Sequence, residues 1–312
     1  MFCNNVGSQG GASPTLAPYI VPLLYTMLIT SPANPRIGKV RDLHTSRGRK
    51  RSGLLFVEGL NIFEILLDMS IEPHEVYYCP DLLRRTERGT QLLQRILSAP
   101  LAEERRIEVT TRVIEALSDA MTSQGIVGTL SIDTLSPHAT RQRRIQLSSS
   151  TSTYRPVLLV LDDIADPGNM GTILRTALAT DVDAVLLTPD CTDPYSPKVM
   201  RAAAGTHFLL PLESDLSWAQ IATRIRTHCG EQTVRVLLAE AGSVRLYYEE
   251  DLTHPFALIM GNEAHGPSHD ARTLATQHIS LPLANHVESL NAAMATGILL
   301  YEAARQLRIH NR

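Results

Sequence analysis

The sequence predicts an α/β protein in which a small amino-terminal domain precedes a larger domain built on a parallel sheet. At 312 residues, the chain is too long for a single core of ordinary size. After residue 155, apolar runs of strand length alternate with stretches of helical spacing, which is typical of βαβ units. Small and polar residues directly follow three of these strands. In an open parallel sheet, this pattern indicates a ligand crevice at the carboxyl ends of the strands.

The amino-terminal part alternates in the same way over shorter segments. Runs of apolar and aromatic residues predict strands over 54–57 and 75–78. Helical spacing of apolar residues predicts helices over 61–69, 89–97 and 113–120. This part is therefore expected to be a small α/β domain.

The carboxyl-terminal part carries the longer alternation. Apolar runs predict strands over 157–161, 184–187, 208–212, 234–239, 256–260 and 279–283. Helices are expected over 171–180, 197–204, 218–228, 268–276 and 289–307. The last helix places several apolar residues near one stripe, namely Leu290, Met294, Ile298, Tyr301 and Leu307.

The segment between the two parts is not expected to bury a core. Residues 134–154 contain few large apolar side chains, a basic cluster and a run of serine and threonine, which predicts a flexible linker. We therefore divide the folded chain into a domain at 28–133, a linker at 134–154 and a domain at 155–312.

The first residues are expected to lie outside the folded protein. Residues 16–30 are apolar, but Pro18 and Pro22 interrupt them and no basic segment precedes them. This stretch is too short and too broken for a membrane span, and it is atypical of a signal peptide. We expect residues 1–27 to be a disordered or misannotated leader, with translation starting at Met27.

The composition disfavours several classes of protein. A formal net charge of −3 argues against a uniformly basic nucleic-acid binder, although local charge can differ. The four cysteines lack the spacing of a disulfide framework or a zinc site, and the eleven histidines are scattered. We therefore expect a cytoplasmic protein that needs no metal.

Three segments with chemically capable side chains directly follow predicted strands. They are residues 163–175 (DIADPGNMGTILR), 260–266 (MGNEAHG) and 281–291 (LPLANHVESLN). In the first, Asn169 suits the start of a helix and Arg175 falls one to two turns into it, so a capped helix with a solvated arginine is the simplest interpretation. The glycines at 168 and 171 lack the GxGxxG spacing of a dinucleotide site.

Together, these segments resemble the SpoU (TrmH) family of RNA ribose 2′-O-methyltransferases, in the SPOUT superfamily. The resemblance implies that residues 155–312 form a parallel-sheet methyltransferase domain with a trefoil knot, a rare exception to the rule against knots. It also implies S-adenosylmethionine as the cofactor and a homodimer whose interface completes the active site.

The resemblance further implies roles for individual residues. Residues expected in catalysis are Asn169, Arg175, Glu263, Ser289 and Asn291, and those expected to hold the cofactor are Gly261, Leu281 and Leu290. Without the family resemblance, Glu263 would be interpreted as a surface carboxylate and Asn291 as a helix cap. Leu281 and Leu290 would be interpreted as core residues. Two positions depart from the family pattern: Asn285 stands where glycine is frequent, and Ala293 where serine is frequent. Neither change removes an expected catalytic group.

Arg175 is expected to be essential, but its part in proton transfer stays open. A ribose 2′-hydroxyl must lose its proton as it attacks a methyl group. Arginine is normally protonated and is a poor general base. It can instead bind the neighbouring phosphate and stabilise developing negative charge.

A basic cluster near the amino terminus predicts contact with RNA phosphates. Seven basic residues stand there against a single aspartate: Arg36, Lys39, Arg41, Arg47, Arg49, Lys50 and Arg51. The same stretch could be a solvated helix face. Segments 31–36, 56–59 and 123–125 resemble the substrate-binding domain that precedes many of these methyltransferases. Residues 28–133 are therefore expected to bind RNA through an L7Ae/L30e-like fold.

The sequence thus predicts an S-adenosylmethionine-dependent RNA 2′-O-methyltransferase. The additional amino-terminal domain favours 23S ribosomal RNA over transfer RNA, by analogy alone. The alternatives are a transfer-RNA enzyme, a non-catalytic RNA-binding protein of ribosome assembly and a nucleotide-dependent dehydrogenase. The intact catalytic set disfavours a non-catalytic RNA-binding protein. The missing GxGxxG loop disfavours a dehydrogenase.

Overall fold

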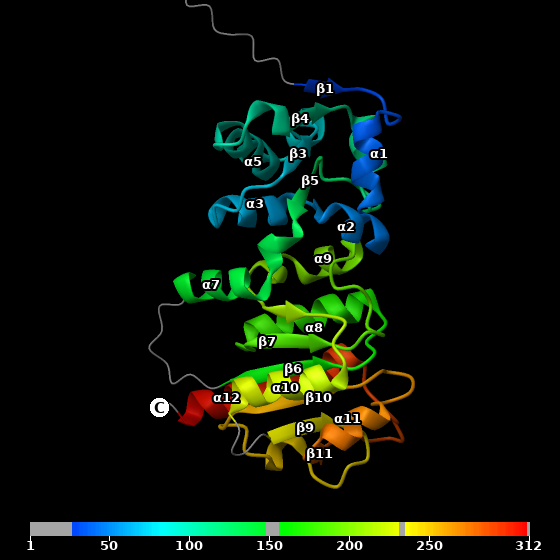
Figure 1. Ribbon diagram of the computed structural model, residues 1–312, viewed down its shortest axis with the longest axis vertical. Helices are drawn as coiled ribbons and strands as arrows, with labels where there is room; N and C mark the ends of the chain where they lie inside the picture. The colour runs from blue at the N-terminus through cyan, green and yellow to red at the C-terminus, as the bar shows by residue number, and fades with distance from the viewer. Residues whose placement is uncertain (1–26, 148–155, 231–234, 311–312) are drawn as a thin grey trace, which may run out of the picture.

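A computed structural model describes residues 27–147, 156–230 and 235–310. The described residues form two α/β parts stacked along the long axis of the molecule, with helix α9 (Pro197–Ala203) between them (Figure 1). The α/β fold class and the parallel carboxyl-terminal sheet predicted from the sequence are confirmed.

The amino-terminal sheet is mixed, in the order β1-β4-β3-β5-β2. Strand β5 pairs antiparallel with β2 and β3, whereas β1, β4 and β3 are parallel to one another. Its strands are β1 (Met27–Ile29), β2 (Leu54–Glu58), β3 (Glu75–Tyr78), β4 (Arg106–Val109) and β5 (Ile126–Ser131). Its helices are α1 (Pro35–Asp42), α2 (Ser46–Ser52), α3 (Leu60–Asp68), α4 (Pro80–Leu83), α5 (Glu87–Ser98) and α6 (Thr111–Leu117).

The described strands of the carboxyl-terminal sheet are all parallel, in the order β11-β9-β10-β6-β7-β8. They are β6 (Val157–Leu161), β7 (Ala184–Leu187), β8 (Leu212–Glu213), β9 (Arg235–Ala239), β10 (Phe256–Met260) and β11 (Gln277–Ile279). The further helices are α7 (Pro137–Leu147), α8 (Pro167–Ala179), α10 (Trp218–Cys229), α11 (His269–Leu274) and α12 (Ala292–His310).

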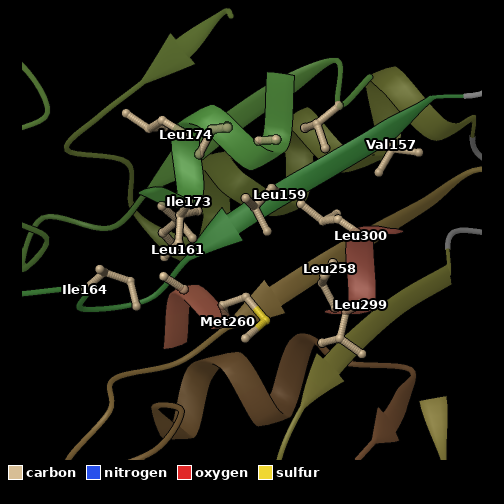
Figure 2. Packing of buried hydrophobic residues seen from close by; sticks show 14 of the residues in the cluster. Val157, Leu159, Leu161, Ile164, Ile173, Leu174, Leu258, Met260, Leu299 and Leu300 are labelled. Atoms are coloured by element: carbon tan, nitrogen blue, oxygen red, sulfur yellow. The ribbon is translucent and has the colours of Figure 1, made fainter. Parts of the chain in front are cut away.

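Strands β6 and β10 form the centre of this sheet and are buried along their whole length. Helices α8 and α12 cover one face, where Leu159 and Leu258 pack with Ile173 and Leu299 (Figure 2). Helices α10 and α11 supply side chains to the cluster on the other face. Burial on both faces explains why these strands appear in the sequence as unbroken apolar runs.

Two predicted strands differ from the structure. The strand predicted over 208–212 is wrong at its start: Gly205, at φ +91°, turns the chain into a 3₁₀ helix at Thr206–Phe208, and only Leu212–Glu213 pairs with β7. The strand predicted over 279–283 lies earlier, at β11. Pairing with β9 stops at Ile279, and Pro282 has no N–H to continue it.

Two helices also begin elsewhere than predicted. Helix α8 starts at Pro167 because Asp166 caps it, accepting a hydrogen bond from the Asn169 N–H at 2.7 Å. Helix α12 starts at Ala292, because Asn291 lies outside it and accepts a hydrogen bond from the Ala293 N–H at 3.0 Å.

The prediction of a flexible linker is wrong for residues 137–147, which form helix α7, and residues 134–135 end a 3₁₀ helix at Ile132–Leu135. Arg143 donates to the Phe208 carbonyl at 2.9 Å, and Arg144 donates to the Val182 carbonyl and to Asp181. Arg143 and Arg144 therefore anchor this segment to the carboxyl-terminal part. Residues 148–155, and residues 1–26 of the predicted leader, lie outside the described residues, whereas Met27 belongs to β1.

Helix α9 and the turn after it join the two parts of the molecule. Met200 and Phe208 are buried among the apolar side chains of the amino-terminal part. Arg201 donates to Asp119 Oδ2 at 2.6 Å and lies 3.7 Å from Glu58 Oε2, so one guanidinium faces two carboxylates across the junction. Apolar burial and an ion-pair cluster together fix the amino-terminal part on α9.

The contact between α8 and α9 leaves no room for a side chain at Gly171. A Cβ there would lie 2.3 Å from the Ala202 Cβ and 2.9 Å from the Ala202 carbonyl carbon. We predict that Gly171→Ala lowers the free energy of unfolding by about 1–3 kcal/mol, because the helices must separate. Urea denaturation measures this. Gly38→Ala, also within a helix but with open space around it, is expected to be neutral or stabilising, and an equal loss in both variants would contradict the packing argument.

His207 makes the junction sensitive to acid. Burial lowers the pKa of its imidazole to about 4, despite a hydrogen bond of 2.8 Å between Nε2 and the Pro194 carbonyl. Because the unfolded chain binds a proton near pH 6.5 and the folded chain does not, stability is complete above pH 6.5 and declines as the pH falls towards 4.

We predict that protonation of the His207 imidazole alone removes up to about 3 kcal/mol of unfolding free energy as the pH falls from 6.5 towards 4. In His207→Gln, which keeps a donor but cannot become charged, unfolding free energies measured from pH 7 to 4.5 should fall less steeply. His269→Gln, at an exposed histidine, should keep the wild-type slope. A wild-type slope in His207→Gln would contradict the assignment.

Candidate active site

The loops that follow β6 and β10 are locked together at the carboxyl edge of the sheet. The Asp162 N–H donates to the Met260 carbonyl at 2.9 Å, and the Asp162 carboxylate, only 4% exposed, accepts the Ser268 N–H at 2.7 Å. Asn262 Nδ2 donates to the carbonyl and the carboxylate of Asp163, at 2.9 and 3.0 Å. The first two of the three motifs, residues 163–175 and 260–266, therefore face each other in a fixed arrangement.

Asn169 lies in the middle of a hydrogen-bond chain that joins all three motifs. Its Nδ2 donates to Glu263 Oε1 at 2.5 Å, and its Oδ1 accepts from Asn291 Nδ2 at 2.9 Å. Asn291 also caps α12 through Oδ1, so its amide nitrogen is the atom left to face Asn169. Asn291 therefore caps α12 and also contacts Asn169, while its part in catalysis stays a prediction.

Arg175 does not join this chain. It lies on the exposed side of α8, about two turns after the helix begins, and no described residue accepts a hydrogen bond from it. Its guanidinium therefore has no hydrogen-bond partner among the described residues.

A cavity of about 400 Å³ opens beside this hydrogen-bond chain, at the ends of β9, β10 and β11. Five of the predicted site residues line it: Gly261, Glu263, Leu281, Ser289 and Leu290. A Cβ at Gly261 would lie 2.6 Å from the backbone of Pro267, so the loop closes only over glycine. Asn169, Arg175 and Asn291 are not in the lining, and Asn169 reaches the cavity through Glu263.

The end of β9 contributes residues that sequence reasoning missed. Ala239, Glu240 and Ala241 line the cavity. Burial raises the pKa of the Glu240 carboxyl, but hydrogen bonds from His278 at 2.7 Å and Arg272 at 2.8 Å outweigh it, and the net pKa is lowered. The available signal was positional, because Glu240 follows a fourth buried strand that ends at the same edge.

The basic cluster is split by the fold. Arg49 is 4% exposed and pairs with Asp193 across the junction, so its prediction as an RNA contact is wrong. Arg36 is half-buried and pairs with Glu75 at 2.7 Å. The remaining five side chains are exposed on or beside α1 and α2: Lys39, Arg41, Arg47, Lys50 and Arg51.

Two further observations concern the described ranges only. No group of three or more His, Cys, Asp or Glu side chains in them is placed to hold a metal ion. No helix in them combines the length and the apolar character needed to cross a membrane.

Two sequence families match the two parts of the chain. The SpoU rRNA Methylase family matches residues 156–301, and the MRM3-like substrate binding domain matches residues 34–128. An uncharacterized tRNA/rRNA methyltransferase of Synechocystis sp. is 33% identical over 278 residues, which cover 89% of this chain and 93% of that protein. The resemblance inferred from the three motifs is confirmed.

Solved structures match the whole two-part architecture. An RNA 2′-O ribose methyltransferase is 27% identical, with a TM-score of 0.70, over 91% of this chain and 100% of the other. An AdoMet-bound rRNA methyltransferase from Sinorhizobium meliloti is 26% identical, with a TM-score of 0.71, over 90% of this chain and 98% of the other.

The hydrogen bond between Asn169 and Glu263 predicts the effect of a new charge. Asn169→Asp would place a second carboxylate against Glu263, which raises the pKa of the pair. We predict a loss of about 1 kcal/mol of unfolding free energy at pH 7, discounted for partial exposure, and a smaller loss at pH 4.5 because a shared proton removes the repulsion. Asn285→Asp, in an exposed loop, serves as the control in urea denaturation at both pH values. A loss that does not depend on pH would contradict the role of the new charge.

Proposed function

We propose that this chain, which belongs to the SpoU rRNA methylase family, transfers a methyl group from S-adenosylmethionine to a ribose 2′-hydroxyl of ribosomal RNA. The observation that carries the proposal is the hydrogen-bond chain from Glu263 through Asn169 to Asn291, at the rim of a cavity. The RNA 2′-O ribose methyltransferase and the AdoMet-bound rRNA methyltransferase share both parts of the fold, which supports the reaction and the cofactor.

The cavity fits S-adenosylmethionine in chemistry and in size. Apolar side chains of Met260, Ile279 and Leu299 line one side, and exposed backbone at Gly261 lies on another, as an adenine and a ribose require. Gly261, Leu281 and Leu290 would hold the cofactor, and Glu240, which also lines the cavity, would accept a hydrogen bond from a ribose hydroxyl. When bound, the cofactor supplies an electrophilic methyl group.

The protein's own groups position the nucleophile. Glu263 and Asn291 fix the Asn169 amide, and one hydrogen on Nδ2 remains for a ribose oxygen. Ser289 lies at the cavity wall, where its hydroxyl can bind the same ribose. Arg175 would bind the adjoining phosphate and stabilise the negative charge that develops on the 2′-oxygen, whose proton passes to water. No metal is assigned a role.

We propose a homodimer, because Arg175 does not join the hydrogen-bond chain of its own copy and apolar side chains on α12 are exposed. Apolar side chains are exposed on the first turns of α12 and before it, with Leu290 at 37%, Met294 at 60% and Tyr301 at 56%. Such a stripe supports an interface between two chains. Arg175, which faces away from its own hydrogen-bond chain, would then meet the site of the partner.

We further propose that the segment leading into α12 is part of a trefoil knot. The Ser280 N–H donates to the Arg245 carbonyl at 2.9 Å, and Ser280 accepts from the Tyr247 N–H at 3.0 Å. Near the other end of α12, Gln306 donates to the Glu250 carbonyl at 3.0 Å. The loop between β9 and β10 therefore contacts both the entry to α12 and its later turns, as a threaded segment requires.

The amino-terminal part is proposed as the RNA-binding domain, with the residues after 155 as the methyltransferase domain. The exposed side chains of Lys39, Arg41, Arg47, Lys50 and Arg51 supply the positive charge for phosphates. The MRM3-like match over residues 34–128 supports this assignment. We place the enzyme in the cytoplasm, with a transfer RNA as the alternative substrate.

The test is methyl transfer from labelled S-adenosylmethionine to 23S ribosomal RNA and to transfer RNA. Wild-type protein should label one ribose 2′-oxygen of ribosomal RNA, and Arg175→Ala should lower the rate by about 100-fold or more. Arg226→Ala, an exposed arginine on α10, is the matched control and should keep full activity.

Each other outcome has a defined meaning. Label on transfer RNA alone would keep the chemistry and replace the substrate. Bound cofactor without label on either RNA would contradict the enzyme and favour a non-catalytic RNA-binding protein. Full activity of Arg175→Ala would remove the arginine from the mechanism.

A further inference from the structure

A second cavity lies at the junction of the two parts, away from the one that fits the cofactor. It has a volume of about 190 Å³. Its lining includes Glu58, Asn61, Thr122 and Gln124 from the amino-terminal part, and Arg201 and Ala204 from the end of α9. Since a cavity of about 150 Å³ holds benzene, this one admits a single heterocyclic ring. Neither part of the molecule forms it alone.

Backbone contacts fix the direction of two amide side chains in this cavity. Gln124 Oε1 accepts the Leu60 N–H at 2.8 Å, so its Nε2 must be the free end. Asn61 Nδ2 donates to the Ala204 carbonyl at 3.1 Å, so its Oδ1 must be the free end. Within the described ranges, neither free end has a partner. Two lining side chains therefore carry one unpaired donor and one unpaired acceptor, the pair of groups that a nucleobase edge complements.

The charges in the wall and directly beside it disfavour a phosphate, since Glu58 and Arg201 line the cavity and Asp119 pairs with Arg201. Glu58, 5% exposed, and Asp119 share the single guanidinium of Arg201, which leaves an excess of negative charge. The Glu58 carboxylate also accepts hydrogen bonds from Ser118 and from the Asp119 N–H at 3.1 Å, so it is held in place. A neutral ring with amino or imino hydrogens is therefore favoured over a phosphate oxygen.

The cavity lies close to the candidate active site. Ala204 follows Ala202 and Ala203, which lie against Gly171 on α8, two residues after Asn169. Because the end of α9 contacts the start of α8, the cavity lies beside the helix pair that carries Asn169. Ala204 adopts φ +51°, a conformation costly for alanine, and its carbonyl is held by Asn61.

We propose that this cavity binds one unstacked base of the RNA, pyrimidine-sized, next to the nucleotide that is methylated. The proposal rests on the proposed function for its choice of ligand. It makes Gln124 and Asn61 specificity residues contributed by the amino-terminal part, distinct from the phosphate contacts on α1 and α2. Docking of the two parts then creates a binding site, besides positioning the domain.

The test is equilibrium binding of a labelled twelve-nucleotide oligouridylate to the full chain, compared with an abasic strand that carries the same phosphates. Gln124→Glu keeps the Oε1 acceptor for Leu60 but turns the free donor into an acceptor. It should weaken oligouridylate binding by about fivefold to tenfold relative to Gln94→Glu, which makes the same charge change on exposed α5. Both variants should bind the abasic strand equally. Thr122→Trp, which fills the cavity from its exposed wall, should reproduce the loss.

Equal dissociation constants for Gln124→Glu and Gln94→Glu would overturn the proposal, as would an equal loss on the abasic strand. Thermal melting of each variant shows whether the fold is retained, and Thr122→Trp gives the answer independently if Gln124→Glu is unstable. Because binding is measured without turnover, absence of methyl transfer would count against the proposed function and leave this result intact.

Discussion

The site depends on the hydrogen bonds that lock the loop after β6 to the loop after β10. Asp162 is nearly fully buried and holds the Ser268 N–H, and Asn262 holds Asp163, which adopts φ +58°. A buried carboxylate is stable only when such donors satisfy it. Once these loops are fixed, Glu263 lies within hydrogen-bond distance of Asn169, and the backbone at Gly261 packs against Pro267. The direction in which α8 starts is then also fixed.

The same helix start that carries Asn169 also decides how the two parts are joined. Gly171 allows α9 to lie directly on α8, and α9 carries Met200 and Arg201 into the amino-terminal part. Active-site geometry and domain docking are thus coupled through one close contact between helices. A shift of α9 would displace both the junction cavity and the first turn of α8, because packed interiors do not deform continuously.

The charged side chains are distributed unevenly over the molecule. The chain carries a net charge of −3, yet exposed lysine and arginine gather on α1 and α2, and the junction cavity keeps an excess of carboxylates. Phosphates and bases need opposite surroundings, since phosphates require cations and base edges require oriented dipoles. A chain of slightly negative net charge can therefore bind RNA over a local surface.

The sequence by itself determined the central strands of the carboxyl-terminal sheet and predicted which segments meet at the site. Strands buried on both faces, such as β6 and β10, leave unbroken apolar runs, and the three motifs follow strands whose carboxyl ends must share an edge. Only the tertiary structure decided what the basic residues do. Arg49 and Arg143 have the same charge as Arg47, but burial and a partner distant in sequence make them structural. It also supplied Glu240 and the junction cavity, because both depend on contacts between elements that no local pattern records.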